Sequence, residues 1–197
     1  DYNDSEGYNK IITGFFKTNF VDILINNTQG PSAGDVLSVS ESDYKNAFNL
    51  LFQNTVNTSM AAIKGMKKNN WGRIINMASV SVKEPLSYLA LSNTIRSAVT
   101  SWGKTLSIES GKHNITVNNI LTGFFNTERL NQLNSEKAKK FNVSTEEVFD
   151  KMSEMVPLKR IGEPEEFGYL VAFLASDYAD YINGANIPID GGLLKSM

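Results

Sequence analysis

The chain contains no cysteine and only one histidine, His113, in 197 residues. Without cysteine it can form neither disulfide bonds nor thiolate metal sites, and it has no cysteine nucleophile. A single histidine cannot form a histidine cluster around a metal ion. His113 lies in the stretch Ser110-Gly-Lys-His-Asn114, whose glycine and asparagine predict a solvated turn. The residue types therefore predict no metal centre.

Strong charge and long apolar runs are also missing. The formal net charge is -2 and 20% of the residues are charged, with both signs scattered along the chain. This pattern gives no basic face for nucleic acid and no polybasic patch for a membrane. No apolar run approaches the length of a membrane span or signal sequence. With 41% hydrophobic residues, residues 1–197 are expected to form one soluble, cytoplasmic α/β domain.

The clearest pattern runs from Trp71 to Leu106. Arg73 to Ser79 forms an apolar run that predicts a buried parallel strand. From Tyr88 onward, apolar residues recur every three or four positions, which predicts an amphipathic helix. Ser79 should then lie at the carboxyl end of a parallel strand, where open α/β folds bind their ligands.

Strands and helices are expected to alternate along the rest of the chain. A first helix is capped by Asp4 or Ser5, and Ser40 caps a long helix. The remaining predicted elements are strands at 21–26, 115–121 and 187–190 and helices at 41–69 and 167–176. This order predicts a doubly wound parallel sheet with helices on both faces. The helices at 41–69 and 87–110 should pack side by side on one face.

One segment resists a firm assignment. Residues 128–156 are charged and helical, and Asn142 to Glu147 contains a helix start that resembles a capping box. The segment could form a lid over the ligand cleft, or it could be a solvated excursion from the domain.

Three stretches together resemble the short-chain dehydrogenase/reductase family, nearest its 3-oxoacyl-[acyl-carrier-protein] reductase-like members. They are Gly72-Arg-Ile-Ile-Asn-Met-Ala-Ser79, Ile115-Thr-Val-Asn-Asn-Ile, and the segment from Pro157 to Gly192. The resemblance implies a Rossmann-like oxidoreductase that uses NAD or NADP on a small carbonyl or alcohol substrate. It also implies a homodimer or homotetramer that pairs through the helices at 41–69 and 88–110, to which Phe52, Ala98 and Trp102 contribute extra apolar surface.

The same resemblance assigns the cofactor contacts. The family's turn after its fourth strand stands here as Asn26-Asn27-Thr28-Gln29-Gly30, and Asn26, Thr28 and Gly30 are expected to contact the cofactor. Gly123 and Thr127 match the groups that hold the nicotinamide carboxamide. No Gly-x-x-x-Gly-x-Gly phosphate loop occurs in the sequence, so we expect an upstream segment that carries this part of the fold.

The catalytic positions depart from the family pattern. The family opens its second long helix with Tyr-x-x-x-Lys, in which the Tyr is the proton donor. Aligning Ser92 and Asn93 with the family's Ser-Lys pair places Leu89 at the Tyr position and Asn93 at the Lys position. Leu51 falls at the position of the active-site Asn.

Ser79 remains as the catalytic candidate, although a serine at this point can also simply cap the turn. Tyr88 is predicted to be buried or at an interface, and a displaced catalytic acid is the alternative. Arg96 is predicted to be a surface ion-pair partner.

Two functions follow. The chain is either an NAD(P)-dependent oxidoreductase with a reworked proton donor or a catalytically silent homologue of the same fold.

Overall fold

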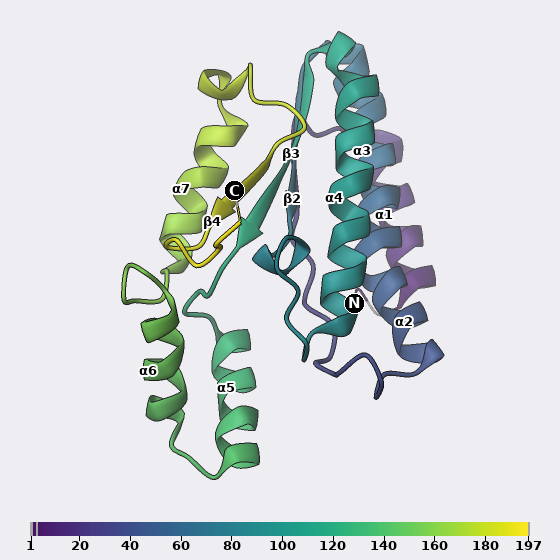
Figure 1. Cartoon of the computed structure of the whole chain (residues 1–197). Helices are drawn as coiled ribbons and strands as arrows, with labels where there is room; N and C mark the ends of the chain where they lie inside the picture. The colour runs from purple at the N-terminus through teal and green to yellow at the C-terminus, as the bar shows by residue number, and fades with distance from the viewer. Residues whose placement is uncertain (1, 3, 197) are drawn as a thin grey trace.

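A four-stranded parallel sheet forms the centre of the molecule (Figure 1). The computed structural model describes residue 2 and residues 4–196. The strands are β1 (Ile23–Asn26), β2 (Gly72–Met77), β3 (Ile115–Thr122) and β4 (Asn186–Ile189). They pair in parallel in the order β1-β2-β3-β4, which confirms the predicted parallel sheet and its strand order.

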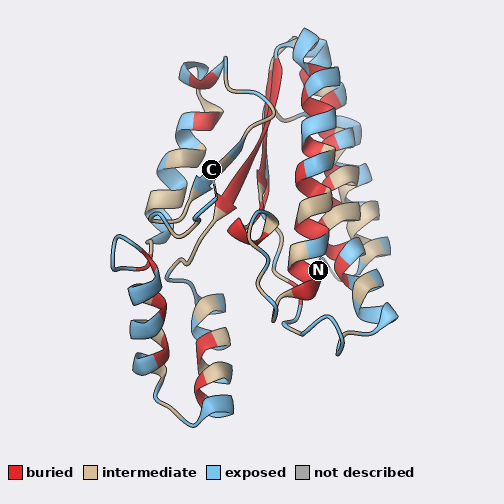
Figure 2. Ribbon diagram, viewed as in Figure 1, coloured by how far each residue is buried: buried red, intermediate tan, exposed pale blue. Residues whose placement is uncertain are grey.

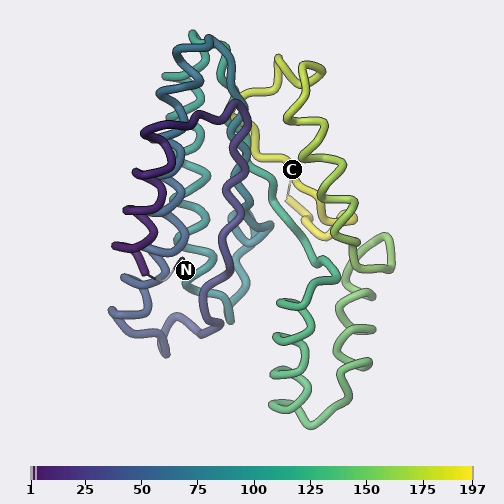
Figure 3. The backbone as a smooth tube through the Cα atoms, turned by 180° about the vertical axis from the view of Figure 1, so that it is seen from behind, coloured from purple at the N-terminus to yellow at the C-terminus, as the bar shows by residue number. Residues whose placement is uncertain are grey.

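Helices cover both faces of this sheet. Three helices that lie close together cover one face, and α7 covers the other, as the front and back views show (Figures 1 and 3). The helices on the first face are α1 (Ser5–Thr18), α3 (Asn54–Asn69) and α4 (Ala90–Ser110), and α7 spans Pro164–Ala175. The predicted side-by-side packing of the two long helices is confirmed. Among the described helices, none is long and apolar enough to span a bilayer.

The predicted helix at 41–69 is continuous but not uniform. It consists of α2 (Glu41–Ala47), a π-helical turn (Phe48–Gln53) and α3. Ser40 caps it as predicted, because its side chain accepts from the Asp43 N–H group while Asp43 accepts from the Ser40 N–H group. The π-helical turn was not predicted, since a locally widened helix leaves the apolar spacing almost unchanged.

Both faces of the sheet are packed with apolar side chains, and the central strands β2 and β3 are almost entirely buried (Figure 2). Toward α3, the core includes Met66, Ile74 and Val117. Toward α7, Ile75, Ile120 and Leu174 form a second cluster. The alternation of Ile74 and Ile75 between the two clusters follows from the two-residue period of a strand.

A row of asparagine side chains crosses the whole sheet. Asn26, Asn76, Asn119 and Asn186 occupy matching register positions on the four strands. The Asn26 Nδ2 donates to Asn76 Oδ1 (2.8 Å), Asn76 Nδ2 to Asn119 Oδ1 (2.9 Å), and Asn119 Nδ2 to Asn186 Oδ1 (2.7 Å). We call these four residues the asparagine ladder. Because each interior amide both donates and accepts within the row, the polar groups are buried without losing their partners.

A glycine lets α4 approach the asparagine ladder. A Cβ atom at Gly103 would lie 2.9 Å from Asn119 Oδ1 and 3.0 Å from Asn76 Nδ2. Any side chain at Gly103 would therefore displace the helix or the amides.

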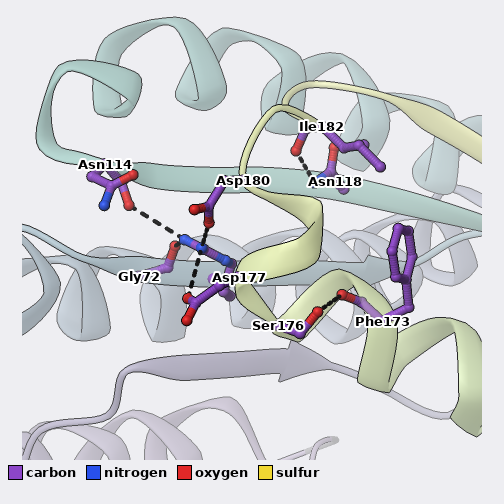
Figure 4. Close-up of polar contacts among 9 residues, drawn as sticks. Gly72, Asn114, Asn118, Phe173, Ser176, Asp177, Asp180 and Ile182 are labelled. Atoms are coloured by element: carbon purple, nitrogen blue, oxygen red, sulfur yellow. Dashed lines mark hydrogen bonds and ion pairs between the residues drawn. The ribbon is translucent and has the colours of Figure 1, made fainter.

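Arg73 anchors the amino-terminal end of β2. Its side chain is 0% exposed and donates to the carbonyl oxygens of Gly72 (2.9 Å) and Asn114 (3.4 Å). It also forms an ion pair with Asp180, in the turn that follows α7 (Figure 4). A buried guanidinium is tolerated here because a carboxylate and two carbonyls surround it.

The segment at 128–156 folds into a helical hairpin, α5 (Glu128–Phe141) and α6 (Thr145–Met155). Ser144 caps α6 by accepting from the Glu147 N–H group (3.0 Å), as predicted. The hairpin has an apolar cluster of its own, which includes Ala138, Val148 and Met152. It extends from the end of the molecule to which β2 and β3 point (Figure 1).

Candidate active site

A cleft of about 540 Å³ opens between the carboxyl end of the sheet and the α5–α6 hairpin. Its lining includes Ser79 after β2, Tyr88 before α4, and Thr122 and Gly123 at the end of β3. One side of α5 closes it, with Leu130, Leu133, Asn134 and Lys137. The structure thus brings together three of the residues selected from the sequence, namely Ser79, Tyr88 and Gly123.

Ser79 lies where the sequence predicted it, directly after the buried strand β2. Its Oγ accepts a hydrogen bond from the Ser81 N–H group (3.1 Å) at the start of a short 3-10 helix, Val80–Val82. The hydroxyl hydrogen takes no part in that bond, so it can be donated to a ligand in the cleft. The turn-capping role and a role in the cleft are therefore compatible.

Tyr88 does not lie on a buried helix face. The helix α4 begins at Ala90, two residues later than the sequence pattern suggested, so Tyr88 belongs to the turn before it. There the ring is partly exposed, lines the cleft, and carries the Lys137 ammonium 4.2 Å from its centroid. The apolar periodicity counted from Tyr88 onward does not apply to Tyr88 itself, because a residue outside the helix does not follow the helical period.

Leu89 and Asn93, at the family's Tyr and Lys positions, lie one helical turn apart at the start of α4. Leu89 is the N-cap residue, and its carbonyl accepts from the Asn93 N–H group (2.9 Å). The Asn93 Nδ2 donates back to the Leu86 carbonyl (2.8 Å). The residue of α4 that reaches the end of β2 is Arg96, which is 8% exposed. It restores neither the Tyr nor the Lys of the family motif.

Arg96 is not the surface ion-pair partner that the sequence suggested. Its Nη1 donates to the Met77 carbonyl (2.6 Å) at the carboxyl end of β2. No carboxylate among the described residues forms an ion pair with it. Burial lowers the pKa of Arg96 to about 10, since a low-polarity environment disfavours the charged form.

The predicted cofactor residues occupy three kinds of environment. Asn26 is committed to the asparagine ladder and also donates to Ser59 Oγ (2.9 Å). Thr127 caps α5 by accepting from the Leu130 N–H group (3.3 Å). Gly123 lies so close to β4 that a Cβ atom would meet Asp190 Cα at 2.8 Å.

Gly30 and Thr28 differ from these residues. There is open space at the Cβ position of Gly30, and the Thr28 hydroxyl forms no hydrogen bond with the described residues. A Cβ atom at Gly30 would meet nothing closer than Arg129 Nε at 4.0 Å. Thr28, two residues earlier, is partly exposed after the end of β1. This turn leaves open space in front of the sheet, which fits the approach of a bound ligand to the backbone.

Two further buried residues, Leu51 and Asn134, bear on the site. Leu51, at the position of the family's Asn, is 2% exposed and packs with Leu91 and Ile95. Asn134 was missed by the sequence reasoning, although it is 1% exposed, lines the cleft, and has no hydrogen-bond partner for either side-chain polar atom among the described residues. No sequence signal marks it, because an asparagine within a charged helix is ordinarily a surface residue.

The parallel sheet with helices on both faces and a cleft at its carboxyl end defines a Rossmann-like, doubly wound protein. The family model described as "Enoyl-(Acyl carrier protein) reductase" matches residues 6–194. The chain belongs to the short-chain dehydrogenase/reductase family. It is 34% identical to the NADPH-dependent reductase BacG of Bacillus subtilis over 177 residues, which cover 90% of this chain and 68% of BacG.

Solved structures agree with this assignment. The NADPH-dependent reductase YwfH, involved in bacilysin biosynthesis, superposes with a TM-score of 0.92 at 31% identity, covering 100% of this chain and 76% of that chain. The L-sorbose reductase of Gluconobacter frateurii, solved with NADPH and L-sorbose, gives a TM-score of 0.91 at 28% identity, with the same coverage. The chain spans about two thirds of the length of the curated relatives it matches.

Proposed function

We propose that the chain is the catalytic part of an NAD(P)H-dependent reductase that converts a small carbonyl compound to an alcohol. The observation that carries this proposal is the cleft at the carboxyl end of the sheet, where Ser79, Tyr88 and the Gly123 turn lie together. Membership of a reductase family and the NADPH named for two relatives support it.

Carbonyl reduction needs a hydride for the carbon and a proton for the oxygen. A reduced nicotinamide cofactor, when bound, would supply the hydride and would itself be oxidised. Tyr88 supplies the proton from its phenol group, because it is the tyrosine of the cleft. Ser79 donates a hydrogen bond to the same oxygen, which holds the carbonyl in place and stabilises the charge that develops on it.

The cofactor would lie along the carboxyl ends of β1 and β3. The open turn at Thr28 and Gly30 would accept its ribose, and the backbone at Gly123 and the hydroxyl of Thr127 would hold its carboxamide. Asn26 would affect the cofactor site indirectly, because its side chain holds the end of β1 in place through the asparagine ladder.

The test of the chemistry is the oxidation of NADPH and NADH by a panel of ketones. With Tyr88→Phe we expect turnover to fall by about 10²- to 10⁴-fold, the usual contribution of a positioned general acid. Ser79→Ala should cost less, because it removes one hydrogen bond and not the proton donor. If Tyr88→Phe retained full turnover while Ser79→Ala abolished it, Ser79 would be the donor and the assignment to Tyr88 would be wrong.

The cofactor contacts need a separate measurement. Gly30→Val with Thr127→Ala should weaken NADPH binding, because one change fills the open turn and the other removes a hydroxyl. Gly168→Ala is the matched control, since a Cβ atom there meets nothing within 4 Å. Unchanged NADPH affinity in the double variant would refute the proposed contacts.

We also propose that α2, α3 and α4 form the interface of a homodimer or homotetramer. Aromatic side chains cluster on this surface. The ring centroids of Phe48 and Phe52 lie 5.0 Å apart, and those of Phe52 and Trp102 lie 6.4 Å apart. Phe48, Met60 and Ile108 are exposed, and Ala98 is partly exposed beside them. Sedimentation at micromolar concentration should show an oligomer that Phe48→Ser with Phe52→Ser converts to a monomer; a monomeric parent protein would contradict the proposal.

A further inference from the structure

Asn134 is the unexplained polar group of the cleft. Its side chain is 1% exposed, and neither Nδ2 nor Oδ1 has a hydrogen-bond partner among the described residues. Leaving a buried donor or acceptor unpaired costs about 1–3 kcal/mol. In the asparagine ladder, by contrast, the buried amides of Asn26, Asn76 and Asn119 pair across the sheet. An amide left unpaired in the lining of a cleft points to a ligand that pairs with it.

A positively charged side chain, Lys137, lies beside Asn134 and favours a ligand that carries a negative charge. Lys137 lies one helical turn further along α5 and therefore on the same side of the helix. It is partly buried, lines the cleft, and forms no ion pair with a carboxylate of the described residues. The other charged residues of the lining, Asp35, Glu136 and Lys140, are exposed, so water screens them. The inner part of the cleft thus presents a net positive charge.

Most of the remaining lining of the cleft is apolar. It includes Leu86, Phe124, Leu130, Leu133, Phe141 and Met152. These side chains suit an apolar body of several carbon atoms.

We propose that the cleft binds 2-oxo acids with an apolar side chain, and that Asn134 and Lys137 together hold the carboxylate. This inference rests on the proposed reductase function and names its substrate class. The Asn134 N–H group donates to the carboxylate, Lys137 neutralises it, and a water that enters with the ligand satisfies Oδ1. Because the Lys137 ammonium lies 4.2 Å from the centroid of the Tyr88 ring, a carbonyl adjacent to the carboxylate lies near the proposed proton donor.

The test compares two probes that differ only in the carboxylate, 2-oxo-4-phenylbutanoate and 4-phenyl-2-butanone. Binding to the full chain is measured by calorimetry, which does not require turnover. We expect the oxo acid to bind at least tenfold more tightly than the ketone. Asn134→Leu and Lys137→Gln should each remove most of that difference. The controls on the same helix are Asn131→Leu and Lys139→Gln, both exposed and outside the cleft lining.

A second readout separates ligand binding from a structural role. Asn134→Leu should leave the melting temperature of the unliganded chain unchanged or higher, because it removes an unpaired buried amide. Equal binding of the two probes, no binding of the oxo acid at millimolar concentration, or a lower melting temperature with unchanged binding would each overturn the proposal. So would Asn134-dependent binding of a neutral polyol such as L-sorbose in place of the acid. Absence of NADPH oxidation with every ketone would instead refute the reductase function, whatever the binding data show.

Discussion

A buried arginine side chain lies at each end of β2, and the two differ in how many hydrogen-bond and ion-pair partners they have. At the amino-terminal end, Arg73 is fully buried and bonded to two carbonyls and to Asp180 (Figure 4). At the carboxyl end, Arg96 is 8% exposed and bonded to one carbonyl, with no carboxylate partner among the described residues. The buried asparagines differ in the same way. The amides of the asparagine ladder are hydrogen-bonded to one another, whereas the Asn134 amide has no partner among the described residues. The ladder amides and the Nη1 and Nη2 groups of Arg73 are paired within the chain, whereas Asn134 at the cleft has no partner among the described residues for either polar atom.

The largest loss of stability is expected from breaking the asparagine ladder at Asn119. Asn119→Leu removes its bonds to Asn76 and Asn186 and leaves the buried Asn76 Nδ2 without an acceptor. We expect the free energy of unfolding to fall by about 2–4 kcal/mol. Urea denaturation measures this, and a loss below about 0.5 kcal/mol would show that the ladder contributes little.

Asp180→Ala should cost about 2 kcal/mol, because it leaves a buried guanidinium without its carboxylate. The loss is smaller than for a fully buried pair, since the Asp180 side chain is 53% exposed and Asp177 lies 3.8 Å from the same Arg73 nitrogen. Thermal unfolding of Asp180→Ala beside Asp177→Ala tests this order. A larger loss for Asp177→Ala would show that the second carboxylate is the true partner.

Gly103→Ala should destabilise the chain by about 1–2 kcal/mol, because the added methyl group would meet the amides of Asn76 and Asn119. The same substitution at Gly168, within α7 and with nothing within 4 Å, should stabilise the chain by about 0.5–1 kcal/mol. Chemical denaturation of both variants gives the difference in their free energies of unfolding. That difference measures the cost of a methyl group where α4 lies close to the ladder. Equal effects would mean that α4 can shift away without cost.

Arg96→Met should change stability least. The variant loses one hydrogen bond to the Met77 carbonyl but also removes a buried cation that pairs with no carboxylate of the described residues, so the two effects offset each other to within about 1 kcal/mol. Unfolding midpoints in urea at neutral pH measure this change. A loss comparable to that of Asp180→Ala would contradict the contrast between the two ends of β2.

Much of this architecture could be predicted from the sequence because it depends on local patterns. The apolar run at Gly72–Met77 and the caps Asp4, Ser40 and Ser144 each determine a nearby element. The asparagine ladder carried a usable signal, since a polar residue inside an apolar strand such as Ile23–Asn26 requires a partner on the next strand.

The site could be predicted only in part. Ser79 follows from the end of a strand, but the position of Tyr88 depends on where α4 begins, and helix ends are poorly marked by periodicity. Asn134 joins the cleft only because the α5–α6 hairpin folds against the end of the sheet. That contact between distant segments leaves no trace in the local sequence.

The contrast between paired and unpaired amides is tested most directly by urea unfolding of two matched variants, Asn76→Leu and Asn134→Leu. Both positions are at most 1% exposed, and both changes replace a buried asparagine with an apolar residue of similar size. We predict that Asn76→Leu lowers the free energy of unfolding by about 2–4 kcal/mol, whereas Asn134→Leu leaves it unchanged or raises it. Equal losses in the two variants would contradict the division between amides that hold the fold and an amide that awaits a ligand.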